Sequence, residues 1–161
     1  MLFRSKLVFQ LAPAQQKVAF QCEFAGIMPE NGKDAVKILT NGDLRFGVRW
    51  SNSKNRLNGK PVAFTLVPEK AEVLREIKLL TSVNRWYAMK SIAGTVFFTD
   101  GTTFTLETKE GFPGGWQGKG NKNHAFSWKQ IPEKPISKIR FSMLPHPFFG
   151  IMIGEAELIR K

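Results

Sequence analysis

The chain has 161 residues, a length that favours one domain with a full hydrophobic core. Aromatic residues make up 12% of it, and this apolar content excludes a disordered chain. Lysine and arginine number 24 against 13 acidic residues, so the net charge is +11, which favours anionic partners such as nucleic acid or acidic polymers. The basic residues are spread thinly, however, and a generally solvated basic surface is the favoured interpretation.

Several classes of protein are excluded at once. No apolar stretch reaches roughly 18 residues, so no membrane span is expected. Cys22 is the only cysteine, so neither an intrachain disulfide nor a cysteine-based metal site can form, and we expect no metal and no cofactor. Residues 1–5 match the translation of a common sequencing adaptor and do not resemble a signal peptide. We therefore predict that 1–5 are a non-native leader, that 6–161 form a single domain, and that the chain is a fragment of a longer gene.

In chain order, the first predicted elements are strands over 7–11, 18–24 and 36–39. Cys22 shares its parity with Val18, Phe20 and Phe24, so we expect it on the apolar face as a small core residue. Asn41-Gly42 then predicts a hairpin turn into the next strand, 44–50.

The segment 44–50 has the clearest period of two. Its apolar residues, Leu44, Phe46, Val48 and Trp50, should be buried, and Arg45 and Arg49 should face water. The apolar set should face Val62, Phe64, Ile139 and Phe141 across the domain.

Further strands are predicted over 62–67, 73–80, 86–89, 92–98, 102–108, 124–129, 136–143 and 151–159. Asp100-Gly101 predicts a hairpin between 92–98 and 102–108. The segment 68–80 also fits a short helix, because Ala71, Leu74, Ile77 and Leu80 are spaced by three. We favour a strand preceded by a turn.

Many short strands, few helices and regular turns indicate an all-β protein. We predict an antiparallel β-sandwich, a jelly roll, over residues 6–161; a barrel or a β-prism would give a similar pattern.

The sequence offers few residues for catalysis, and we expect a binding protein rather than an enzyme. His146 stands between Pro145 and Pro147 in a predicted turn and should be structural. Glu155 and Glu157 lie two apart on the last strand, about 7 Å from each other. Two such carboxylates can perform acid/base chemistry or hold calcium, but we expect a solvent-facing pair on an edge strand.

The stretch 111–129 is the strongest candidate for a binding surface. It is rich in glycine, which forbids a regular element, yet it carries aromatic, amide and basic side chains. Such side chains stack on sugar rings and bond their hydroxyl groups, and they also suit single-stranded nucleic acid. A structural loop with Trp116 folded onto the core is the alternative. The candidate ligand-binding residues are Trp86, Tyr87, Trp116, Gln117, Lys119, Asn121, Lys122, Asn123 and His124.

The first eighty residues resemble a known family. The runs at 6–13 (KLVFQLAP), 18–27 (VAFQCEFAGI), 35–44 (AVKILTNGDL), 59–66 (GKPVAFTL) and 73–81 (VLREIKLLT) follow the strand order of the NPCBM-type putative carbohydrate-binding modules. The ending at 149–159 (FGIMIGEAELI) is similar to the closing strand of jelly-roll carbohydrate modules, with Glu155 at their acidic position.

This resemblance implies a galactose-binding-like jelly roll that binds glycans and is appended to secreted glycosidases. It implies an extracellular or periplasmic location if a signal peptide was lost, and a cytoplasmic one otherwise. Family members often carry an Asp-rich stretch with a tryptophan after the equivalent of 73–81. Here 82–87 (SVNRWY) keeps only Trp86, so no calcium site is implied.

Three functions follow as hypotheses. The first is a noncatalytic module for a glycan or polysaccharide. The second is a binder of nucleic acid or another polyanion through the basic surface. The third is a structural or interaction domain that docks a neighbouring domain of a longer chain.

Overall fold

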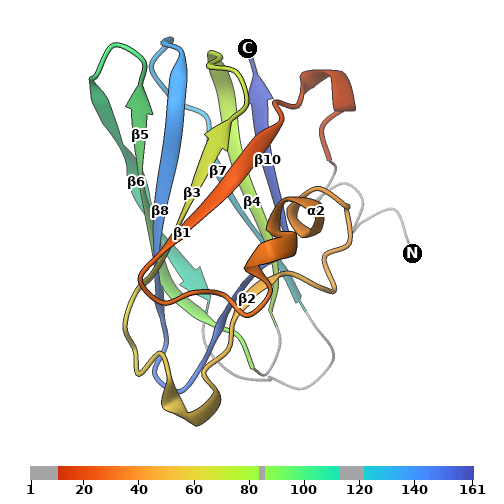
Figure 1. The fold of residues 1–161 in the computed structure, drawn as a ribbon, viewed down its shortest axis with the longest axis vertical. Helices are drawn as coiled ribbons and strands as arrows, with labels where there is room; N and C mark the ends of the chain where they lie inside the picture. Colours follow the sequence, from red (N-terminus) through yellow and green to blue (C-terminus); the bar gives the residue numbers. More distant parts are fainter. Residues whose placement is uncertain (1–10, 84–85, 113–121) are drawn as a thin grey trace.

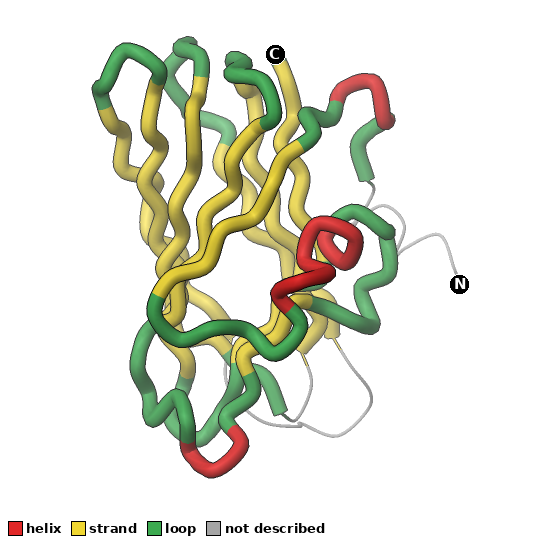
Figure 2. Tube along the Cα trace, viewed as in Figure 1, coloured by secondary structure: helices red, strands yellow, loops and turns green. Residues whose placement is uncertain are grey.

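A computed structural model describes residues 11–83, 86–112 and 122–161 of the chain. Strands dominate the described residues, and the helical segments are short and peripheral (Figures 1 and 2). The strands are β1 (Phe20–Ala25), β2 (Val48–Trp50), β3 (Val62–Pro68), β4 (Leu74–Val83), β5 (Met89–Phe98), β6 (Thr103–Phe112), β7 (Lys122–Trp128), β8 (Ile136–Pro145), β9 (Ile151–Ile153) and β10 (Glu155–Arg160). The helical segments are η1 (Ala14–Gln16), η2 (Gly32–Asp34), α2 (Ala35–Leu39) and η3 (Ser53–Asn55).

The strands form two facing antiparallel sheets, as the sequence predicts. One sheet has the order β1-β3-β8-β5-β6 and the other β10-β4-β7, while β2 and β9 form a separate pair. Aromatic rings fill the space between the sheets: Phe141 lies 5.1 Å from Phe64 and 5.6 Å from Trp128, measured between ring centroids. The antiparallel β-sandwich is confirmed.

Burial alternates along β3 and β8, because each strand turns one face to the core. The ambiguous segment 68–80 is a strand: β4 pairs with β10 on one side and β7 on the other, and Ile77 lies opposite both Leu158 and Trp128. The β5–β6 hairpin at Asp100-Gly101 is also confirmed, with Gly101 at φ +86°. Cys22 packs half-buried against the core, and burial raises the pKa of its thiol to about 12.

The predicted strand at 36–39 is wrong, and so is the hairpin at Asn41-Gly42. Residues 36–39 belong to helix α2, which follows directly from η2, and Asn41-Gly42 lies in the irregular segment after that helix. Ala35 and Leu39 are both buried, and their spacing of four places them on one helical face. A run of four or five residues is too short for its period to separate a strand from one helical turn.

The segment 44–50 is a strand only over Val48–Trp50, and the predicted burial of Phe46 is wrong. Phe46 is 62% exposed and Leu44 only half-buried, whereas Val48 and Trp50 are buried as expected. The backbone turns at Asp43, whose carboxylate accepts a hydrogen bond from the Arg45 amide at 3.0 Å. This local bond competes with strand pairing, which begins only at Val48.

The acidic pair of the last strand is buried, not solvent-facing. Glu155 and Glu157 are each 1% exposed, although β10 is an edge strand as expected. The segment from Ala12 to Val18 and the turn at Gly42 cover this face: the amides of Ala12 and Gly42 donate to Glu157 and Glu155, and Val18 pairs with Leu158. These covering contacts come from residues over a hundred positions away, which strand parity does not reveal.

Candidate functional site

A shallow groove lies at the end of the sandwich opposite the C-terminus, near the η3 turn at the bottom of Figure 1. Three connecting segments form it: the loop after β2, the segment before β5 and the turn after β8. Its lining residues combine three aromatic rings with two hydroxyls and an amide: Trp86, Tyr87, Phe148, Ser51, Ser53 and Asn52.

Backbone hydrogen bonds join the two aromatic segments of the groove. The amide of Gly150 donates to the carbonyl of Trp86, and the amide of Ala88 donates to the carbonyl of Gly150, both at 3.0 Å. Tyr87 and Gly150 form an isolated parallel bridge. A Cβ at Gly150 would lie 2.5 Å from the Trp50 carbonyl oxygen and 3.2 Å from the Tyr87 ring, so only glycine allows this close approach.

Phe148 presents its ring to solvent at a conformational cost. It is 82% exposed and its φ is +72°, a region that bulky side chains rarely enter and that costs about 1–2 kcal/mol. Neighbouring turn geometry holds it there, since the Phe149 amide donates to the His146 carbonyl at 3.2 Å. Trp86, on the other side of this junction, is 63% exposed.

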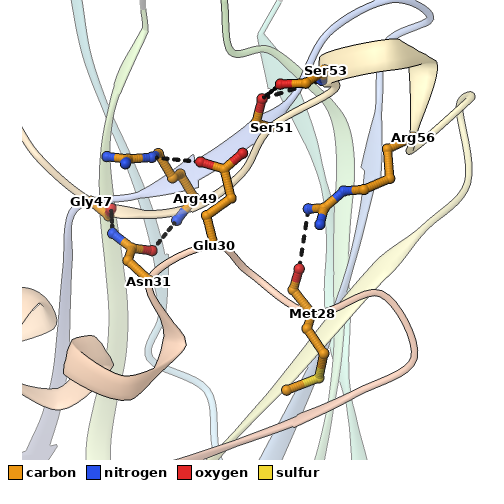
Figure 3. Close-up of polar contacts among 8 residues, drawn as sticks. All are labelled: Met28, Glu30, Asn31, Gly47, Arg49, Ser51, Ser53 and Arg56. Carbon is orange, nitrogen blue, oxygen red and sulfur yellow. Dashed lines mark hydrogen bonds and ion pairs between the residues drawn. The ribbon is translucent and has the colours of Figure 1, made fainter.

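The polar wall of the groove, residues 51–53, begins a tightly turned loop, 51–60. The Ser51 and Ser53 hydroxyls lie 2.6 Å apart (Figure 3), and the Asn52 side-chain oxygen accepts from the amides of Leu57 and Asn58 at 2.8 and 3.4 Å. Backbone strain concentrates here. The four non-glycine residues with positive φ in the described chain are Lys54, Asn55 and Asn58 in this loop and Phe148 across the groove. Clustered strain of this kind is typical of ligand sites.

A polar network holds the strand that leads into Ser51 (Figure 3). The Asn31 amide donates to the Gly47 carbonyl at 2.9 Å and its oxygen accepts from the Arg49 amide at 3.1 Å. The Arg49 guanidinium in turn donates to Glu30 at 3.0 Å. Burial raises the pKa of Tyr87, the charge of Arg49 opposes this shift, and the charge of Glu30 adds to it.

Comparison with known proteins supports the fold. No family model and no curated protein matches the sequence. Among solved structures, an F5/8 type C domain from Bacteroides fragilis superposes with a TM-score of 0.55 at 14% identity, covering 92% of this chain and 99% of that one. A CBM32 domain from Clostridium perfringens, solved with GalNAc-β-1,3-galactose, gives a TM-score of 0.57 at 12% identity over 88% and 95%. A second C. perfringens CBM32 domain, from a family 31 glycoside hydrolase, gives 0.52 at 14% over 90% and 98%.

The chain has the galactose-binding-like fold. The jelly roll that the resemblance implies is thus confirmed, whereas membership of the NPCBM family in particular stays a prediction.

In this galactose-binding-like domain, Trp86 and Tyr87 line the groove together. Their role in ligand binding stays a prediction. His124 lies elsewhere: its ring packs between those of Phe112 and Phe126, at 5.1 and 4.8 Å. Burial lowers the pKa of His124, which favours its neutral form.

The remaining predicted residues fall on or beside the β6–β7 connection. The backbones of Lys122 and Asn123 belong to β7 and pair with Val83 and Ser82 of β4. Val83 precedes Trp86 by three positions in the sequence. The rest lie outside the described residues: Trp116, Gln117, Lys119 and Asn121.

Sequence reasoning missed Phe148 and the 51–53 wall. Phe148 follows Pro145-His146-Pro147 directly, and these prolines break the chain between two strands. An aromatic residue at such a break does not belong to the buried face of either strand, and this was the signal in the sequence. Ser51, Asn52 and Ser53 follow β2 in an Asn- and Ser-rich stretch that predicts a turn and nothing more specific.

No group of three or more His, Cys, Asp or Glu side chains able to hold a metal ion occurs among the described residues. Near Glu155, Asp43 is already paired with Arg45 at 3.0 Å, and Glu155 itself accepts the Gly42 amide. One oxygen of the Glu155 carboxylate therefore accepts a backbone donor, and the other has no hydrogen-bond partner among the described residues. No helix within 11–83, 86–112 and 122–161 is long and apolar enough to span a membrane.

Proposed function

We propose that this domain is a noncatalytic carbohydrate-binding module and that the groove is its ligand site. The observation that supports this most is the set of exposed rings, Trp86 and Phe148, held beside Tyr87, Asn52 and two serine hydroxyls. Sugar rings present C–H patches that stack on aromatic faces, while amides and hydroxyls bond their hydroxyl groups. The similar fold of two CBM32 domains, one solved with a disaccharide, agrees with this proposal.

Among the described residues that line the groove, none has a side chain of the kind that glycoside hydrolysis requires. Its described lining residues include no carboxylate, histidine or cysteine. Glu30 is already paired with Arg49 and is not among the lining residues of the groove. Binding without chemistry is the function that fits these residues.

The test is a screen of immobilised glycans with the wild type, Trp86→Ala and Phe148→Gly. Glycine removes the Phe148 ring and also relieves its strained φ, so lost binding with unchanged stability points to a ligand contact. We expect each variant to lose about tenfold or more in affinity. Phe46→Ala is the matched control, because Phe46 is equally exposed but does not line the groove. If no glycan is retained by the wild type, or if Phe46→Ala weakens binding as much as Trp86→Ala, the proposal fails.

A further inference from the structure

The charged residues of the loop 51–60 are all basic. This loop carries Lys54, Arg56 and Lys60 and no acidic residue. All three are exposed. Within the described part of the chain, none of them forms an ion pair with a carboxylate.

Arg56 is fixed in place by a neutral partner. Its Nη2 donates to the carbonyl oxygen of Met28 at 3.1 Å (Figure 3), which restrains the side chain without cancelling its charge. The loop beneath it is braced by Asn52, which also lines the groove and whose oxygen holds the Leu57 amide. The guanidinium keeps further N–H donors in a planar fork, the geometry that matches a carboxylate or sulfate.

Arg49 provides a contrast at the same end of the sandwich. Its Nε lies 3.0 Å from a carboxylate oxygen of Glu30, so its charge is compensated within the protein. Arg56 has no such partner among the described residues. Positive charge without a carboxylate partner therefore lies in the same loop whose first residues, 51–53, line the groove. The backbone of this loop is held in strained conformations at Lys54, Asn55 and Asn58.

When one sugar of a polysaccharide stacks in the groove, the sugars on either side of it must lie outside the groove. We propose that the ligand is an anionic glycan, with uronate carboxylates or sulfate esters, and that Arg56 binds the charged group of a sugar flanking the stacked one. This rests on the proposed function. Lys54 and Lys60 add attraction at longer range, whereas Arg56 alone has the restrained fork that a bidentate contact needs.

The experiment compares polymers with one backbone that differ only in charge. One pair is polygalacturonate in de-esterified and fully methyl-esterified form, and the other is a galactan with and without sulfate esters. Affinity electrophoresis or calorimetry is run with the wild type, Arg56→Ala and Lys70→Ala. Lys70 is an exposed residue of the β3–β4 connection, at the opposite end of the domain, and its loss changes the net charge equally.

We expect the wild type to bind at least one charged polymer about tenfold more tightly than its neutral counterpart, and Arg56→Ala to remove most of this preference. Lys70→Ala should leave the preference within about twofold, as is usual for a remote surface charge. The pair that shows the preference identifies the carboxylate or the sulfate as the recognised group. Trp86→Ala should weaken binding to both members of that pair.

Two results would overturn the inference and leave the proposed function intact. One is equal affinity for charged and neutral polymers with dependence on Trp86. The other is a charge preference that Arg56→Ala and Lys70→Ala reduce to the same extent, which would indicate bulk charge. Failure of the proposed function looks different: no polysaccharide binds, or single-stranded DNA binds as tightly as the charged glycans and without dependence on Trp86.

Discussion

The amide of Gly150 donates to the carbonyl of Trp86 at 3.0 Å and so joins two segments that lie more than sixty positions apart in the chain. Through this contact Phe148 comes to lie beside Trp86 and Tyr87. The groove therefore depends on Gly150, which is not itself one of its lining residues.

Gly150→Ala should damage the groove more than the fold. A Cβ at this position meets the Trp50 carbonyl at 2.5 Å and the Tyr87 ring at 3.2 Å, so the two segments must separate. We expect a loss of about 1–3 kcal/mol in the free energy of unfolding and a larger relative loss of glycan affinity. Gly101→Ala, at the remote β5–β6 hairpin with φ +86°, should lower stability without changing affinity. Denaturant titration and glycan binding on both variants check this, and equal affinities would contradict it.

Phe141→Ala and Phe46→Ala should differ sharply in stability. Phe141 is fully buried between Phe64 and Trp128, so its removal should cost about 3–5 kcal/mol. Phe46 is 62% exposed, so its loss should stay within about half a kcal/mol. Urea unfolding of the two variants measures this, and comparable losses would show that the sheet register differs from the one described.

The buried Glu155 should make stability depend on pH. Burial raises the pKa of Glu155 to about 7, the Gly42 hydrogen bond and Lys17 oppose this, and Glu157 adds to it. One carboxylate oxygen of Glu155 has no hydrogen-bond partner among the described residues, which also disfavours the ionised form.

The sign follows from the raised pKa. The folded protein binds the Glu155 proton more tightly than the unfolded chain does, so this stabilisation is complete below about pH 4.5 and is lost as the pH rises through about 7. Its size is on the order of 3 kcal/mol, since one unit of pKa corresponds to roughly 1.4 kcal/mol. Glu155→Gln keeps the shape and cannot ionise, so the variant should be the more stable protein at pH 8 and close to the wild type at pH 5. Identical pH profiles of unfolding for the two proteins would show that Glu155 is ionised at little cost.

The sequence predicted the sandwich because its long strands have one wet and one buried face, as β3 and β8 do. It failed where long-range contacts override local pattern. Phe46 fits a strand by parity, but the Asp43 turn removes it from the sheet. Glu155 and Glu157 fit a wet edge, but residues from the start of the chain cover them. Part of the candidate site was predictable, because Trp86-Tyr87 stands out in the sequence. Phe148 was not, because it joins this pair only through the Gly150 contact.

The position of the ligand site is tested most directly by amide chemical shifts, recorded while the domain is titrated with a glycan that it retains. We predict that the largest shifts fall on residues 51–53, 86–88 and 148–150, with the Trp86 indole among them, and that the outer face of β1, β3 and β8 is unchanged. Shifts confined to 116–124, with none at Ser51–Ser53, Trp86 or Phe148, would contradict the groove and return the site to the β6–β7 connection.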